Sequence, residues 1–201
     1  MANTNSPLGF VPMGNAGGAA PNFELLSSGF INISKSDTNK VFTGDPVKRL
    51  STGYLAAWTA GTNTALLAGI FMGCEYYSTS QQKIIFSRYW PGADATNDPI
   101  CRILPVTGAV APRFWVQSNG TAFAFADLNI NADADMGTAG NTTTGNSGAA
   151  LNQSTIASTA TLPFKIVELY SSYQNYGNGS DNTTSYNRAI VVANNAGLIG
   201  V

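Results

Sequence analysis

The chain has 201 residues, a length that suits one all-β domain and leaves little room for two full domains. Ten Lys and Arg residues stand against eleven Asp and Glu, so the formal net charge is −1 and the cations are too few for a face that binds nucleic-acid phosphates. The chain has no histidine, which excludes a histidine-based triad, an imidazole general base and a histidine-ligated metal.

Residues 1–22 predict an extended N-terminal arm. Pro7, Pro12 and Pro21 alternate with glycines, a composition that disfavours helices and paired strands. The arm has four larger apolar side chains: Leu8, Phe10, Val11 and Met13. We take these four as candidate contacts with a partner surface, since such an arm usually lies on its own domain, a sister subunit or a foreign partner; a frayed terminus is the alternative. We expect the rest of the chain to fold without the arm, because the arm contributes no strand. The sequence predicts neither a signal peptide nor a membrane-spanning segment.

From residue 23 onward, short apolar runs alternate with turns, which is typical of β-strands. In the first half of the chain these runs cover residues 23–33, 41–42, 53–58, 65–77, 83–90 and 100–107. The longest run contains Gly69 and Gly73, which favour close approach of neighbouring strands over a helix.

In the second half the runs cover residues 113–117, 121–126, 163–170 and 186–193. Asn119-Gly120 separates the first two and predicts a tight hairpin between them. Residues 136–163 contain no charged side chain and are rich in Gly, Thr and Asn, which predicts a long loop. About ten short strands without helical periodicity predict an all-β barrel or sandwich over residues 23–201.

Candidate reactive groups are few. Cys74 and Cys101 predict two buried, reduced thiols with a structural role, and a single disulfide is the alternative. Asp127, Asp133 and Asp135 fit a divalent cation only loosely, so a solvated loop is the favoured interpretation. The chain lacks a Gly-x-Ser-x-Gly motif and a marked carboxylate pair. We therefore expect no enzyme activity, no catalytic residue, no cofactor and no metal.

Aromatic residues gather in four places: Tyr76-Tyr77, Tyr89-Trp90, Phe114-Trp115 and Phe123 with Phe125. A platform on which sugars stack is one interpretation. In a strand, however, one of two adjacent side chains normally points into the core, which favours packing instead.

Seven landmarks in order resemble a family of tailed-bacteriophage virion proteins, the capsid decoration or cement proteins. They are Phe42-Thr-Gly-Asp-Pro-Val47, Gly53-Tyr-Leu55, Gly69-Ile-Phe-Met-Gly-Cys-Glu-Tyr-Tyr77, Tyr89-Trp-Pro-Gly92, Phe114-Trp-Val-Gln117 with the Asn119-Gly120 turn, Thr144-Gly-Asn-Ser147 and Leu162-Pro-Phe-Lys-Ile-Val167. Each landmark alone is a turn plus a strand, and the resemblance lies in their order over residues 30–170.

The resemblance implies a β-rich structural virion protein, made in the bacterial host cytoplasm and located on the outer capsid surface. There it would bridge neighbouring major capsid proteins and stabilise the shell against internal DNA pressure. Its partners would be the major capsid protein and further copies of itself, in a homo-oligomer, with no nucleic acid and no membrane. The alternative is a host-surface glycan-binding module of a phage tail or head fibre.

Overall fold

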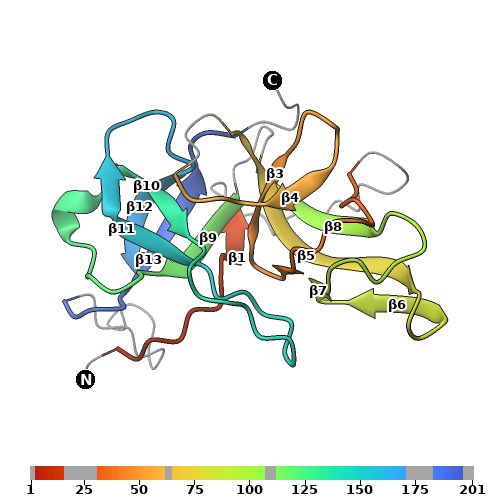
Figure 1. Cartoon of the computed structure of the whole chain (residues 1–201). Coiled ribbons are helices and arrows are strands. Elements are labelled where there is room, and N and C mark those ends of the chain that lie inside the picture. Colours follow the sequence, from red (N-terminus) through yellow and green to blue (C-terminus); the bar gives the residue numbers. More distant parts are fainter. Residues whose placement is uncertain (1–2, 16–30, 62–64, 107–111, 171–182, 197–201) are drawn as a thin grey trace.

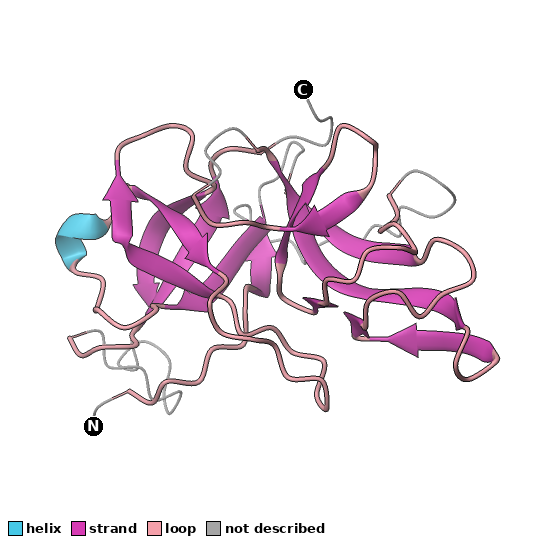
Figure 2. Ribbon diagram, in the orientation of Figure 1, coloured by secondary structure: helices cyan, strands magenta, loops and turns pink. Residues whose placement is uncertain are grey.

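The computed structural model describes residues 3–15, 31–61, 65–106, 112–170 and 183–196. Over these residues the chain is all-β, as predicted, with no α-helix (Figures 1 and 2). The elements are β1 (Val11–Asn15), β2 (Val41–Phe42), β3 (Pro46–Arg49), β4 (Leu55–Ala57), β5 (Leu67–Ser78), β6 (Lys83–Ser87), β7 (Tyr89–Trp90), β8 (Ile100–Pro105), β9 (Pro112–Gln117), a 3-10 turn η1 (Phe125–Asp127), β10 (Asn131–Asp135), β11 (Ala150–Ala157), β12 (Phe164–Tyr170) and β13 (Arg188–Ala193). The strand expected at residues 23–33 lies largely outside the described residues.

The strands form two main antiparallel sheets that lie side by side in Figure 1. One sheet has six strands in the order β1-β9-β13-β12-β10-β11. The other has the order β4-β3-β5-β6, with β8 also paired to β5. The short strands β2 and β7 pair with each other. Both sheets are open in the described residues, so neither forms a closed barrel there.

The long strand β5 joins two hydrophobic cores. In its first half, Leu67 and Ile70 point into the core beneath the six-stranded sheet, while Ala68 and Phe71 point into the core of the second sheet. A strand that is buried on both faces has a continuous run of apolar residues in its sequence, so apolar and polar residues do not alternate in this half of β5. Beyond Gly73, the buried apolar residues of β5, Cys74 and Tyr76, belong to the second core only.

The prediction that the N-terminal arm contributes no strand is wrong. β1 pairs antiparallel with β9 and forms one edge of the six-stranded sheet. Phe10 is fully buried and stacks on Phe164, with ring centroids 4.2 Å apart. The Gly- and Pro-rich composition gives no local sign of a strand here. The strand is stabilised by contacts with residues more than 100 positions away, which a local pattern does not report.

The predicted hairpin at Asn119-Gly120 does not form. Both edges of β9 are already occupied, by β1 and by β13, so a strand at residues 121–126 has no free partner. Instead, Phe123 is buried in the core, and the Asn187 side chain hydrogen-bonds both its backbone N–H and its carbonyl. The segment then continues into the η1 turn.

The predicted loop at residues 136–163 is also corrected, because it contains β11. The small residues of this segment allow its backbone to pack closely against neighbouring side chains. A side chain at Gly140 would collide with the ring of Phe42, and one at Gly145 would collide with Arg88. This segment therefore packs against β2 and against Arg88, which lies between β6 and β7, while its β11 strand belongs to the six-stranded sheet.

A polar junction holds the two sheets together at this point. Phe10 donates its backbone N–H to the Gly44 carbonyl, and Ser147 donates its N–H to the Thr43 carbonyl. Gly44 has a φ of 98°, and a side chain there would lie 2.9 Å from the Leu8 carbonyl oxygen, so only glycine fits without strain.

The buried carboxylate of Asp45 completes the junction. It accepts hydrogen bonds from the backbone N–H of Phe42 and from the Ser147 hydroxyl. Burial removes the carboxylate from water and raises the pKa of Asp45 to about 6, although both hydrogen bonds act in the opposite direction.

Candidate functional site

The second half of β5 carries an open apolar face. Beyond Gly73, Cys74 and Tyr76 point into the second core, while the alternate side chains point outward. In Figure 1 this half of β5 extends with β6 away from the six-stranded sheet, which therefore does not cover it. We define the apolar face by four exposed side chains on β5, β6 and β8: Tyr77, Ile84, Phe86 and Ile100.

The pairing register brings these four side chains together. Tyr77 lies opposite Ile84, and Glu75 lies between Phe86 on one neighbouring strand and Ile100 on the other. Ile84 is 59% exposed and Phe86 is 67% exposed, values far above those of core residues of the same type. The Arg102 guanidinium lies over the Phe86 ring, 5.8 Å from its centroid, which is a contact typical of a cation and an aromatic face.

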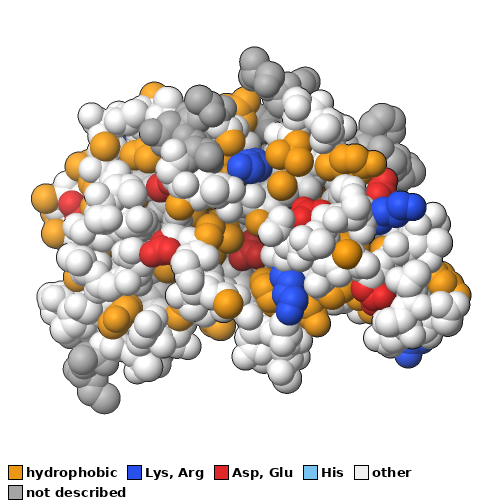
Figure 3. Space-filling view, in the orientation of Figure 1, with side chains coloured by type: hydrophobic (Ala, Val, Ile, Leu, Met, Phe, Trp, Pro, Cys, Tyr) orange, Lys and Arg blue, Asp and Glu red, His pale blue; other side chains and the backbone are white. Residues whose placement is uncertain are grey.

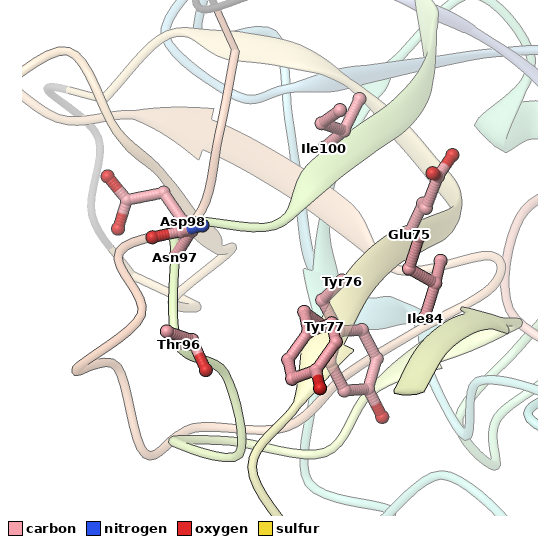
Figure 4. Close-up of a pocket in the computed structure, with 8 residues that line it drawn as sticks. All are labelled: Glu75, Tyr76, Tyr77, Ile84, Thr96, Asn97, Asp98 and Ile100. Carbon is pink, nitrogen blue, oxygen red and sulfur yellow. The ribbon is translucent and has the colours of Figure 1, made fainter. Parts of the chain in front are cut away.

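A cleft of about 380 Å³ lies on this face, between β5 and the segment that leads into β8 (Figure 4). Eight residues line it: Glu75, Tyr76, Tyr77, Ile84, Thr96, Asn97, Asp98 and Ile100. Figure 4 shows the Tyr77 ring between Thr96 and Ile84, and the Asp98 carboxylate directed away from it.

Hydrogen bonds hold the wall of the cleft in place. Asp98 accepts from the Lys35 backbone N–H and from the Tyr54 hydroxyl, both at 2.8 Å. The bond to Asp98 raises the pKa of Tyr54 above its ordinary value. Asp98 is thus engaged on the side away from Tyr77, and the other carboxylate at the cleft is that of Glu75, which lies beside the apolar side chains of Tyr77 and Ile100.

Hydroxyl groups also fix the turn between β5 and β6. Asp94 accepts from the hydroxyls of Ser78, Thr79 and Ser80 and from the Ser80 N–H. These donors, Ser78 first, lower the pKa of Asp94 below its ordinary value, against a smaller opposing effect of burial. The hairpin that carries the apolar face is therefore anchored to the loop before β8.

The four arm residues singled out from the sequence lie elsewhere. Phe10 is in the core, and Val11 is half-buried in β1, opposite Trp115. Leu8 and Met13 are exposed, but β1 is part of the six-stranded sheet, whereas the apolar face belongs to the other sheet. The structure thus does not bring these four residues together with the cleft.

Most of the aromatic clusters pack as predicted. Trp90, Phe114 and Phe123 are fully buried, and Tyr76 meets Trp90 edge-on with centroids 5.3 Å apart. Tyr77 is the member of its pair that points outward. Trp115 lies beneath the Arg188 guanidinium at 4.7 Å and stacks with Tyr170.

The expectation of a solvated loop for the aspartates is wrong for Asp133. It lies in β10, is buried, and accepts hydrogen bonds from the Trp58 indole N–H and the Gly61 backbone N–H. It therefore ties the loop after β4 to the six-stranded sheet. In the described part of the chain, no group of three acidic or cysteine side chains is arranged to hold a metal ion.

The two cysteines are buried and free, as predicted. The structure adds that Cys74 and Cys101 lie directly opposite each other on β5 and β8. Burial raises the pKa of the Cys74 thiol, and it raises that of Cys101 to about 12.

One local signal for the apolar face is present in the sequence. Ile84-Ile85-Phe86 places three large apolar residues in succession, and a strand directs at least one of them away from its own core. Which side stays open, however, depends on where the six-stranded sheet ends along β5.

Comparison with known proteins returned no matching family model, no matching curated protein and no matching solved structure. Among the described residues, no helix is long and apolar enough to cross a membrane. The charged side chains visible in Figure 3 form small, separate spots among neutral polar and apolar atoms.

Proposed function

We propose that this chain is a structural virion protein that binds the outside of a phage capsid, bridges neighbouring major capsid proteins and stabilises the shell. The apolar face of Tyr77, Ile84, Phe86 and Ile100 is the observation that carries the proposal. Adjacent large apolar side chains around a cleft are typical of a surface that binds another protein. The resemblance of the sequence landmarks to capsid decoration proteins supplies the class of partner.

The size of the apolar face suits attachment in many copies. Full burial of one such side chain contributes roughly 1.5–3 kcal/mol. Because the four side chains are already partly buried, covering them completely contributes about half of that for each, before the cost of association is subtracted. One contact of this kind is modest. Repetition over a shell, with each copy touching two capsid subunits, raises the effective affinity through multivalency.

The cleft fits an apolar side chain better than a sugar. Sugar sites need polar groups that converge beside an aromatic ring. Here Tyr77 is flanked by Ile84, and the Asp98 carboxylate is engaged by Lys35 and Tyr54 on the far side. Glu75 supplies one carboxylate across the cleft from Asp98, so the two acidic groups do not converge beside the ring. The glycan-binding alternative is therefore less favoured by this geometry.

The test is co-sedimentation with expanded capsids of the phage that encodes the chain, stripped of this protein. We expect Ile100→Ser to weaken binding by about three- to tenfold, which corresponds to the loss of one such contact. Val167→Ser is the matched control, because Val167 and Ile100 are both 37% exposed but Val167 lies on β12 of the other sheet. The control variant should bind like the unmodified chain, and binding should persist at moderate salt, since ion pairs contribute little.

Two results would overturn the proposal. One is an unmodified chain that stays in the supernatant at every capsid concentration tested. The other is equal binding by the Ile100→Ser variant and the unmodified chain, which would remove the apolar face from the interface. Retention of the chain on glycans or host cells, with no capsid binding, would favour the host-binding alternative instead.

A further inference from the structure

In the described part of the chain, the outer edge of strand β6 has no strand beside it. Among the described residues it pairs only with β5, and it ends the order of its sheet (Figure 1). Its pairing with β5 runs without interruption from Lys83 to Ser87, so no bulge twists the edge away. The strand also contains no proline, and Lys83 at its start is its one charged residue. Soluble proteins usually protect such an edge with several of these devices.

The edge that β6 presents among the described residues is apolar as well as unpaired. Ile84 and Phe86 point to the open face and are among the most exposed large apolar residues of the described chain. In an antiparallel ladder, the backbone groups of alternate residues of β6 point away from β5, toward solvent. The strand thus offers both hydrogen-bonding groups and apolar side chains to an incoming strand.

We propose that a second copy of the chain occupies this edge. In this dimer β6 pairs antiparallel with β6 of the partner, about a two-fold axis that passes between Ile85 of one copy and Ile85 of the other. In this register Ile84 lies opposite the partner's Phe86, and Lys83 lies opposite the partner's Ser87. Arg88, just beyond the strand, faces the partner's Gln82. Apolar side chains meet apolar ones, and no two cations oppose each other.

Neighbouring registers are less favourable. Side chains alternate between the two faces of a strand, so a register shift of one residue would place the open face of one copy beside the core face of the other. Only registers that differ by two residues keep the two open faces on the same side. A pairing centred on Ile84 places Phe86 opposite the partner's Gln82. A pairing centred on Phe86 places Ile84 opposite the partner's Arg88. The register about Ile85 alone matches both exposed apolar residues.

The low charge of the chain favours this occupant. A net charge of −1 leaves little long-range repulsion between two copies. The two-fold contact is isologous, the commonest form of soluble homo-oligomer. An axis perpendicular to the sheet keeps both apolar faces on the same side, so the dimer presents one face of double width. The pairing itself does not depend on capsid binding, although it would give the proposed bridging function two attached faces.

The first experiment measures self-association of the purified full chain by sedimentation velocity. We expect a dimer whose dissociation constant rises at least tenfold in Phe86→Lys, since a lysine in an edge strand opposes pairing. Phe125→Lys is the control, because Phe125 is 82% exposed but lies in η1, away from the β6 edge. Circular dichroism verifies that both variants remain folded.

The second experiment tests the register. Ile84→Cys and Phe86→Cys variants are mixed and exposed to oxidised glutathione, which takes up the two electrons as the inter-subunit disulfide forms and two glutathione thiols are released. Directly opposed residues in a ladder lie within disulfide range, so the mixture should yield the 84–86 cross-link in excess over 84–84 and 86–86. The native cysteines are buried and do not compete.

A chain that remains monomeric at high micromolar concentration overturns the dimer, as does equal weakening by both lysine variants. Predominant 84–84 or 86–86 cross-links overturn the register. A dimer that ignores capsids contradicts the proposed function alone, whereas a monomer that binds capsids contradicts this inference alone. A capsid-protein strand that protects the β6 edge of a monomeric chain from hydrogen exchange would identify a different occupant.

Discussion

The buried Asp45 carboxylate makes the stability of the junction depend on pH. Its pKa of about 6 in the folded chain exceeds the ordinary value of 3.8, because burial disfavours the charged form. The folded state therefore takes up a proton at a higher pH than the unfolded chain does. Stability contributed by this group is then gained as pH falls through 6 and is complete below 3.8.

The size of the effect follows from the shift. A difference of this size is worth about 3 kcal/mol in full, and about 2 kcal/mol of it should develop between pH 7.5 and pH 4.5. The hydrogen-bonded Asp94, whose pKa is lowered, loses its contribution only at more acidic pH, outside this window. We thus expect the free energy of unfolding to rise on mild acidification, the reverse of ordinary acid denaturation.

Urea unfolding at several pH values between 7.5 and 4.5 measures this gain. Asp45→Asn provides the reference, because an amide has the same shape as the carboxyl group that bonds Phe42 and Ser147 and carries no charge at any pH of the series. The pH dependence of this variant should be flatter than that of the unmodified chain by about 2 kcal/mol. Parallel curves for the two proteins would refute the reasoning.

Two further predictions concern the core. Phe10→Ala should lower the free energy of unfolding by about 3–5 kcal/mol, because it leaves a cavity against Phe164, and calorimetry would detect the lowered transition temperature. A decrease in the free energy of unfolding of less than about 1 kcal/mol would show that the N-terminal segment is a loose arm that contributes little to the fold. Cys74 and Cys101 should react with a thiol reagent far more slowly in the native chain than in urea, since burial raises the pKa of both thiols. Rapid native labelling of both would contradict their place in the core.

Local sequence patterns predicted much of the fold. The apolar runs at residues 65–77, 100–107 and 163–170 correspond to β5, β8 and β12, because alternation and turn residues act over a few positions. The strand β1 was missed because Phe10 finds its partners in Phe164 and Gly44, far along the chain. No local pattern reports such contacts.

The candidate site was harder to predict for a related reason. The sequence favours packing for the pair Tyr76-Tyr77 without deciding which ring is exposed, and along much of β5 an apolar residue is buried on either face. The exposure of Tyr77 and Ile84 follows from the length of β5, whose second half extends beyond the residues that line the first core. The end of one core along a strand is a tertiary property, and it decides which apolar residues remain available to a partner.

The two halves of β5 have different structural roles, which explains why the apolar face can bind a partner without disturbing the fold. The first half of the strand supplies Leu67, Ile70 and Phe71 to the cores and is held by the junction around Asp45. The second half keeps its register through the buried side chains of Cys74 and Tyr76. The outward side chains of β6 therefore add little to folding, and threonine would satisfy the strand equally well at Ile84 or Phe86. The fold would tolerate polar residues at these exposed positions. A partner surface that covers them best accounts for the large apolar residues found there.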